Sequence, residues 1–308
     1  MDLNALWLAI LALGAALING AVGYGFSSTV TPIAILWYSN KVLNPALVIV
    51  EVSVNVALLT RERRYLRATW PRARPVVLTL LPGVVLGTLG LAYLAVNDVK
   101  LIVYVVLLPL VAIQLFGFSR PFRNEQRGGS AVGPFIGFLY ALTTISGPPL
   151  ALFLRNQGIS KREFRCTIAQ IRVAESSLTL GTYLAFDSLF SSNLVTFPAL
   201  SLIPYLLVPV VVGVPLGTLM LTRISPQVFL RVVMTVDGLI VSYGLTRVFV
   251  SLGWISDGLS YLFLAVLFSG VGILAAISVG RLQATAAPGT VSLPPTMADG
   301  GAAPPDSS

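Results

Sequence analysis

Hydrophobic residues along the chain fall into ten long, nearly uniform runs, with the polar residues gathered between them. The runs are Leu3–Ile18, Ser27–Trp37, Asn44–Thr60, Pro75–Val96, Leu101–Phe118, Ala131–Leu154, Cys166–Phe186, Leu194–Leu221, Gln227–Val250 and Gly258–Gly280. A membrane-spanning helix needs about 20 residues. Lipid admits only helices and closed barrels, and barrel strands alternate in hydrophobicity where these runs do not. The pattern therefore predicts an all-α, polytopic helical membrane protein.

Composition supports this fold class. Of 308 residues, 56% are hydrophobic and only 10% are charged. A soluble domain carries roughly 25% charged residues. So few charges cannot cover a surface that faces water, so most of the surface must face lipid.

Residue types that are missing exclude several functions. The chain has no histidine and one cysteine, Cys166, which rules out His-ligated zinc or haem and an internal disulfide. It also has no P-loop and no dinucleotide-binding fingerprint. We therefore expect no enzyme activity, no catalytic residues, no metal and no cofactor.

The end of the chain differs from the rest. After Arg281, alanine, proline, glycine and serine dominate, a composition that cannot bury a core. We expect one transmembrane domain over residues 1–281 and a disordered tail over residues 282–308.

A weak internal repeat divides the membrane part. Gly20 and Pro32 match Gly137 and Pro149, and the Leu-Gly-Thr-Leu segment 86–89 recurs at 216–219. This order of matches predicts repeat one at about 5–118 and repeat two at about 131–250. The run at 258–280 is then an extra transmembrane helix at the C-terminal end.

Each repeat begins with a helix that glycine and proline interrupt, at residues 20–32 and 143–149. Each interrupted helix could be a kinked crossing helix or a hairpin that returns to its own side. Two hairpins would place all but four of the twenty Lys and Arg residues on one side; the four are Lys41, Lys100, Arg172 and Arg247. A crossing second block would split the basic residues almost evenly, so the positive-inside rule favours hairpins.

Two hairpins have a consequence for the architecture. Each repeat then holds a hairpin plus three crossing helices, an odd number, so the repeats are inverted relative to each other. Inverted repeats with broken helices recur in secondary transporters. The expected N-terminus lies outside and the C-terminus in the cytoplasm.

The two interruptions are the predicted substrate site. Helix starts carry free N–H groups and a partial positive charge, which suits an oxyanion. The predicted substrate-binding residues are Gly23, Tyr24, Gly25, Ser27, Ser28, Thr29, Thr143, Thr144, Ser146, Gly147 and Arg172. Alternatively, the small residues serve only tight helix packing.

Charged residues within apolar runs are the second group of candidates. Such a residue costs at least roughly 2.5 kcal/mol in the bilayer, so it usually faces a partner or a cavity. Arg172 either holds an anion or forms a structural ion pair. Predicted coupling residues are Glu51, Asn55, Glu175 and Asp237; for Glu51, pairing with Arg172 across the repeats is the alternative.

Several of these segments resemble one family. Gly23-Tyr24-Gly25-Phe26 with Thr31-Pro32, Ser146-Gly147-Pro148-Pro149 and the twin Leu-Gly-Thr-Leu segments are similar to the TauE/SafE family of sulfite and organosulfonate exporters, over about residues 5–280. The resemblance implies a multi-pass transporter of small anions in the bacterial inner membrane. Many relatives have a denser glycine run where this chain has Phe26–Thr29.

The expected function is secondary transport of sulfite, a sulfonate or a related oxyanion by alternating access. The resemblance to that family implies export. The alternatives are a passive anion channel and a non-transporting sensory or assembly protein. Expected partners are a small anion and membrane lipid, the latter at the arginine-rich loop 61–74 with Tyr65 and Trp70. No nucleic acid is expected, and a homo-oligomer is left open.

Overall fold

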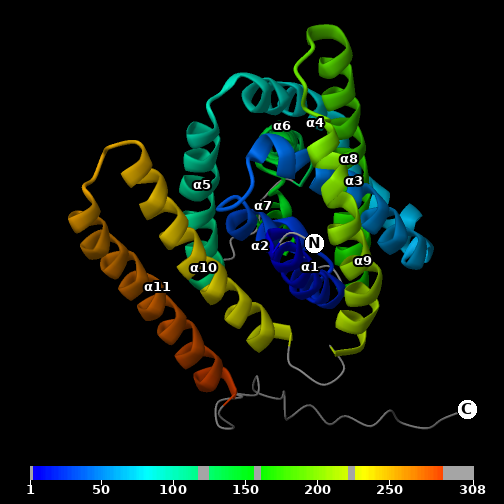
Figure 1. Ribbon diagram of the computed structural model, residues 1–308. Helices are drawn as coiled ribbons and strands as arrows, with labels where there is room; N and C mark the ends of the chain where they lie inside the picture. Colours follow the sequence, from blue (N-terminus) through cyan, green and yellow to red (C-terminus); the bar gives the residue numbers. More distant parts are fainter. Residues whose placement is uncertain (1–2, 117–124, 156–160, 221–225, 287–308) are drawn as a thin grey trace, which may run out of the picture.

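A computed structural model describes residues 3–116, 125–155, 161–220 and 226–286, and within these ranges the chain forms eleven α-helices (Figure 1). They are α1 (Leu3–Val22), α2 (Phe26–Ala34), α3 (Asn40–Arg61), α4 (Leu66–Tyr93), α5 (Val96–Phe116), α6 (Glu125–Thr143), α7 (Gly147–Arg155), α8 (Lys161–Phe190), α9 (Phe197–Met220), α10 (Pro226–Ser251) and α11 (Asp257–Ala286). A 3₁₀ turn, Arg63–Tyr65, joins α3 to α4. The expected all-helical fold class is confirmed.

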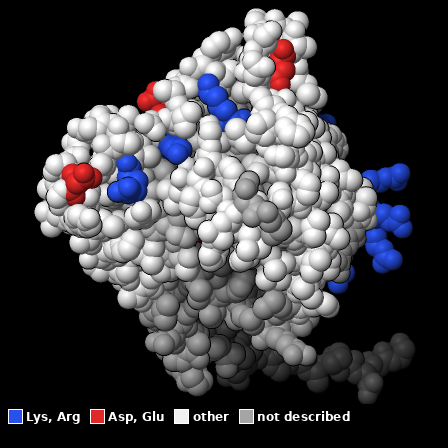
Figure 2. Space-filling model, in the orientation of Figure 1, with Lys and Arg blue, Asp and Glu red and all other residues white. Residues whose placement is uncertain are grey.

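Six of the described helices are long and apolar enough to cross a membrane. Their candidate spans are Leu3–Ala21, Asn40–Thr60, Arg63–Tyr93, Val96–Ile113, Phe197–Leu219 and Asp257–Ser278. The 30-residue helix α8 is as long but more polar, because it carries buried groups such as Gln170, Arg172 and Glu175. In Figure 2, charged side chains gather at two edges of the visible face, and a broad uncharged band separates them.

The first predicted break is present between α1 and α2. Helix α1 ends at Val22 and α2 begins at Phe26. Gly23 and Gly25 between them have φ values of 93° and 113°. Side chains rarely adopt such values, so glycine is what lets the chain turn here.

The second predicted break lies between α6 and α7. Its residues are Thr144, Ile145 and Ser146, and Thr144 has a φ of 61°. A positive φ is uncommon for a β-branched residue and stores strain. The Thr144 hydroxyl offsets part of it with a 2.6 Å hydrogen bond to the Thr143 carbonyl.

Two pairs of helices pack most extensively, α4 with α6 and α1 with α9. Both pairs approach at glycine. A Cβ atom on Gly83 would lie 1.8 Å from the Pro134 carbonyl oxygen, and one on Gly20 would lie 2.1 Å from the Val214 carbonyl oxygen. Small residues let helix backbones in membranes come this close.

These contacts follow a regular correspondence between the two halves. When each of α1–α5 is exchanged with its counterpart among α6–α10, the pair α1 with α9 becomes α6 with α4. In the same way, α4 with α8 becomes α9 with α3, and α2 with α10 becomes α7 with α5. The matched residues Gly20 of α1 and Gly137 of α6 make corresponding contacts. Gly20 packs against α9, and Gly137 packs against α4.

The N-terminal end of α8 lies against the turn between α3 and α4. Arg72 and Glu163 form a 4.0 Å ion pair, and the Gln170 amide donates to the Leu66 carbonyl at 2.8 Å. At the other end of α4, the Lys41 ammonium donates to the Ala92 carbonyl at 2.8 Å. The basic segments around 61–74 and 161–165 are therefore neighbours, away from Lys41.

Some predictions fall outside the described residues. They concern the loops at 117–124, 156–160 and 221–225 and the tail from 287 onward. Helix α11 continues to Ala286, six residues beyond the predicted end of the last apolar run.

Candidate functional site at the helix breaks

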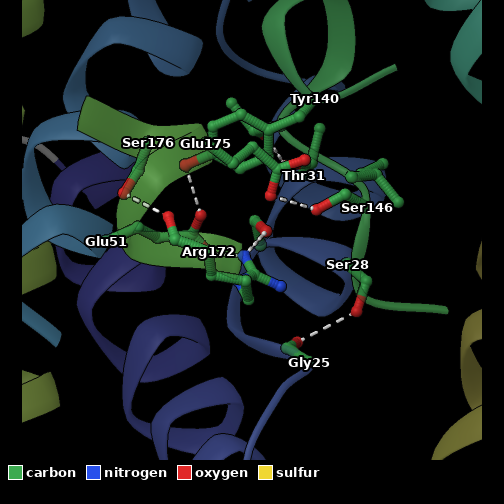
Figure 3. Close-up of polar contacts among 12 residues, drawn as sticks. Gly25, Ser28, Thr31, Glu51, Tyr140, Ser146, Arg172, Glu175 and Ser176 are labelled. Atoms are coloured by element: carbon green, nitrogen blue, oxygen red, sulfur yellow. Dashed lines mark hydrogen bonds and ion pairs between the residues drawn. The ribbon is translucent and has the colours of Figure 1, made fainter. Parts of the chain in front are cut away.

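Arg172 of α8 forms the centre of the site (Figure 3). Its Nη2 lies 2.6 Å from Glu51 Oε1 of α3, and the two side chains are only 3% and 2% exposed. The Tyr140 hydroxyl of α6 donates to the other Glu51 oxygen at 2.6 Å. The guanidinium carbon lies 5.8 Å from the centre of the Tyr140 ring. A buried ion pair thus joins α3, α6 and α8.

Both helix breaks reach Arg172. Arg172 Nη2 also donates to Ser27 Oγ in the first turn of α2, at 3.3 Å. A Cβ atom on Gly147, the first residue of α7, would lie 3.1 Å from Arg172 Nη1. The absent side chain at Gly147 is therefore what lets the guanidinium stand beside the start of α7.

The two breaks also contact each other. The Thr31 and Thr144 hydroxyls lie 2.9 Å apart, which connects the middle of α2 to the second break. The Ser146 hydroxyl donates to Glu175 Oε2 at 2.7 Å. The second oxygen, Glu175 Oε1, is buried and has no hydrogen-bond partner among the described residues.

The starts of α2 and α7 differ as anion sites. Helix α2 opens with Phe26, Ser27 and Ser28, each of which has a backbone N–H that the helix itself leaves unpaired. Helix α7 opens with Gly147, Pro148 and Pro149, and proline has no N–H. The donors that remain free therefore belong chiefly to α2, on the side of Ser27 and Arg172.

Other predicted residues are hydrogen-bonded within their own segment or contact the start of α8. The Ser28 hydroxyl donates to the Gly25 carbonyl at 3.2 Å, and the Thr143 hydroxyl donates to the Leu139 carbonyl at 2.6 Å. The Tyr24 ring packs edge-on against Phe164, with centroids 6.3 Å apart. Gly23 lies beside the Arg165 side chain. Tyr24 also reaches the start of α7, since a Cβ atom on Gly147 would lie 3.0 Å from its Cδ2 and 3.1 Å from Arg172 Nη1.

The remaining coupling candidates lie apart from Arg172 or lack a partner. Asn55, one turn beyond Glu51, is buried, and its Nδ2 has no hydrogen-bond partner in the described part of the chain. Asp237 of α10 is buried beside Thr29 of α2, whose hydroxyl has no hydrogen-bond partner among the described residues. Thr179 repeats the Asn55 position on α8, one turn beyond Glu175, and its hydroxyl is unpaired as well among described residues.

Sequence reasoning missed Tyr140. It lies in an apolar run between Leu139 and Ala141, where nothing in the sequence separates a tyrosine that bonds a carboxylate from one that packs. Thr31 was used for the family resemblance but was not among the predicted site residues. Its place between Gly25 and Pro32, within the glycine- and proline-interrupted segment, was a usable signal.

A cavity in the described part of the chain lies away from Arg172. It has a volume of about 330 Å³ and is bounded by α5, α10 and the residues that follow α2, and none of the predicted substrate-binding residues lines it. The helix breaks are closed around Arg172 in this conformation, since Ser27, Thr144 and Ser146 are fully buried. An anion can reach the guanidinium only if the elements around it move.

This arrangement offers a cation, two carboxyls and hydroxyl donors where two broken helices meet. The family model described as "Sulfite exporter TauE/SafE" matches residues 8–245. The chain belongs to the TauE/SafE family. The curated proteins and the solved structures compared with the chain contain no match.

The match covers both breaks, Glu51, Arg172, Glu175 and Asp237, and ends before α11. The chain is therefore a multi-pass membrane protein of the TauE/SafE family, a family of transporters that is generally non-enzymatic. The resemblance drawn from the glycine and proline segments is confirmed.

Proposed function

We propose that this TauE/SafE protein is a secondary transporter that exports sulfite, a sulfonate or a related small oxyanion across the bacterial inner membrane by alternating access. The observation that carries the proposal is Arg172, a buried arginine held at 2.6 Å from Glu51 beside the starts of two broken helices. An arginine inside a membrane protein is costly and marks a pathway more often than a packing site.

The proposed site is the space between Arg172, Ser27 and the first turn of α2. In our proposal a substrate anion replaces the Glu51 carboxylate at the guanidinium, and the hydroxyl of Ser27 and the α2 N–H groups bind its other oxygens. Glu51, released from Arg172, then becomes free to take up a proton. Glu175, bonded to Ser146, and Asp237 are the other proposed coupling residues.

The proposed architecture is an inverted repeat of two hairpins, α1–α2 and α6–α7, each followed by three crossing helices. The exchange of helix contacts between halves supports it. So does the contact between the α3–α4 turn and the start of α8, because only a returning α6–α7 puts these basic segments on the same side. That side is the cytoplasm by the positive-inside rule.

The proposed motion is a rocking of two rigid groups of helices. The pairs α1–α9 and α4–α6 are locked by backbone contacts at Gly20 and Gly83, so each is expected to move as one body. Between the groups, the contacts at the breaks are single side-chain hydrogen bonds such as that between Thr31 and Thr144. These are the bonds that would open and close.

Counterflow in proteoliposomes tests the function. Vesicles with purified protein and internal sulfite should exchange it for external labelled sulfite with saturation, and Arg172→Ala should lower the rate by at least about a hundredfold, since a bound anion loses its charge-assisted partner. The matched control is Arg67→Ala, an exposed arginine of α4, which should leave the rate unchanged.

The outcomes separate the candidates. Flux with unitary conductance and no counterflow would identify a channel. No flux of sulfite, thiosulfate, sulfonates or short carboxylates in the unaltered protein, or equal flux in Arg172→Ala, would refute the proposed transporter site.

A further inference from the structure

The 330 Å³ cavity described above is positively charged and lies apart from Arg172. Lys100 of α5 and Arg247 of α10 both line it, and its described lining contains no carboxylate. Within the described part of the chain, neither cation forms an ion pair or a hydrogen bond. Two cations without a partner in one concave site make it attractive to an anion, which could pair with both.

The rest of the lining combines aromatic and aliphatic side chains with polar ones. Trp37 and Tyr243 line the cavity and are 46% and 41% exposed, and Leu36 and Val248 add aliphatic surface. Asn97 and Ser251 supply further polar groups. Small-molecule sites are typically concavities of about 300–1,000 Å³ in which apolar and aromatic surface is combined with placed polar groups.

The size of the cavity selects among anions. An inorganic oxyanion of four or five heavy atoms would touch the two cations and leave the aromatic wall uncovered. A larger anion with an apolar body can contact both. We infer that this cavity is a second anion site, which binds an organic anion with its charged group between Lys100 and Arg247 and its apolar body against Trp37 and Tyr243.

Tyr104 lies between this cavity and helix α2, and it separates the cavity from the helix breaks. Its side chain lines the cavity, is fully buried, and donates from its hydroxyl to the Pro32 carbonyl of α2 at 3.0 Å. Pro32 follows Thr31, which contacts the second break. The cavity and the Arg172 site thus lie at opposite ends of the nine-residue helix α2, separated by Tyr104.

The inference concerns binding and stands apart from transport. It is tested on the purified full-length protein in a non-ionic detergent, with 4-nitrobenzenesulfonate as the probe, because a nitroaromatic bound against Trp37 quenches its fluorescence. We expect saturable quenching that disappears in Trp37→Phe. The neutral isostere 4-nitrobenzenesulfonamide should quench at least about tenfold more weakly, and methanesulfonate should compete poorly with the probe.

Charge variants assign the site. Lys100→Ala and Arg247→Ala should each raise the Kd of 4-nitrobenzenesulfonate by at least about tenfold, as expected for loss of one charged partner, while Lys100→Arg should retain binding. Arg67→Ala is the surface control. Lys100→Ala should keep the sulfite counterflow that depends on Arg172, so that failure of the transporter proposal and failure of this one give different results. Unchanged Kd values in both cavity variants would overturn the inference.

A lipid phosphate is the other source of an anion for the same cations. Nanodiscs of phosphatidylcholine alone and with added phosphatidylglycerol distinguish the two. Equal probe affinity in both supports a site for free organic anions. If phosphatidylglycerol displaces the probe, and its retention in native mass spectra depends on Lys100 and Arg247, the cavity is a lipid site and the inference is wrong.

Discussion

At the scale of single residues, the ion pair between Arg172 and Glu51 dominates the interior. Both side chains are almost completely buried, and Tyr140 bonds the carboxylate from the other side. Removing two charges from water is expensive, and a close, hydrogen-bonded geometry recovers much of that expense. The pair is thus more informative about function than about net stability, since apolar residues of similar size would pack there at no greater cost.

The first prediction concerns Glu51→Gln. The substitution leaves the Arg172 charge buried without a carboxylate partner on α3, so we expect the protein to lose about 3–5 kcal/mol of stability. The unfolding temperature of the purified protein in detergent measures it. Glu51→Gln with Arg172→Gln should be less destabilised than Glu51→Gln alone, because no unpaired charge remains.

The control for this measurement is Glu62→Gln at the end of α3, a position that is half-buried rather than enclosed. It should shift the unfolding temperature little. If Glu51→Gln and Glu62→Gln shift it equally, the buried charge of Arg172 does not depend on Glu51 as its partner.

At the scale of helices, two kinds of glycine have different tasks. Gly23 and Gly25 turn the chain between α1 and α2 through positive φ values. Gly20 and Gly83 lie within helices and allow a neighbouring backbone to approach. The first kind creates the break that brings Ser27 to Arg172. The second kind lets the long helices that flank the breaks pack closely against their neighbours.

The second prediction concerns Gly83→Leu. Even the first side-chain atom would lie 1.8 Å from the Pro134 carbonyl oxygen, so α4 and α6 must separate, at an expected loss of more than about 3 kcal/mol. The yield of monodisperse protein in size-exclusion chromatography measures it. Gly270→Leu on α11 is the matched control, because a Cβ atom there meets nothing within 4 Å, and its yield should be normal. Similar yields would show that this close approach is dispensable.

At the scale of the whole molecule, the charged side chains on the visible face lie at its edges, apart from one another (Figure 2). The arginine-rich turn after α3 lies with the start of α8, whereas Lys100 and Arg247 line one cavity. Between these edges the outward-facing side chains are apolar, among them Leu86, Val211 and Leu262. A band of this kind is what contact with lipid requires.

The third prediction concerns topology. In a Cys166→Ser background, single cysteines at Arg64 and Arg162 should react with an impermeant maleimide from the same side of intact cells or vesicles, and a cysteine at Asp98 should react from the opposite side. All three positions are exposed. Opposite labelling of Arg64→Cys and Arg162→Cys would rule out the proposed hairpin at α6–α7 and with it the inverted repeat.

The sequence by itself determined that this protein lies in a lipid bilayer and where its helices break. Uniform apolar runs leave helices as the way to satisfy the backbone in lipid, and clustered glycine and proline cannot continue a helix; both effects are local. The family followed from the same segments. Arg172, Glu51 and Glu175 were found as candidates because a charge in an apolar run stands out whatever the fold.

The tertiary structure alone decided which of these groups meet. From the sequence, either Glu51 or Glu175 could have paired with Arg172. The fold pairs Arg172 with Glu51, 121 residues away, while Glu175 accepts a hydrogen bond from Ser146. Tyr140, and the cavity between Lys100 and Arg247, had no local signal. Contacts between distant segments depend on how closely the helices pack, which no local pattern shows; for α1 with α9 and α4 with α6, glycines such as Gly20 and Gly83 allow the close approach.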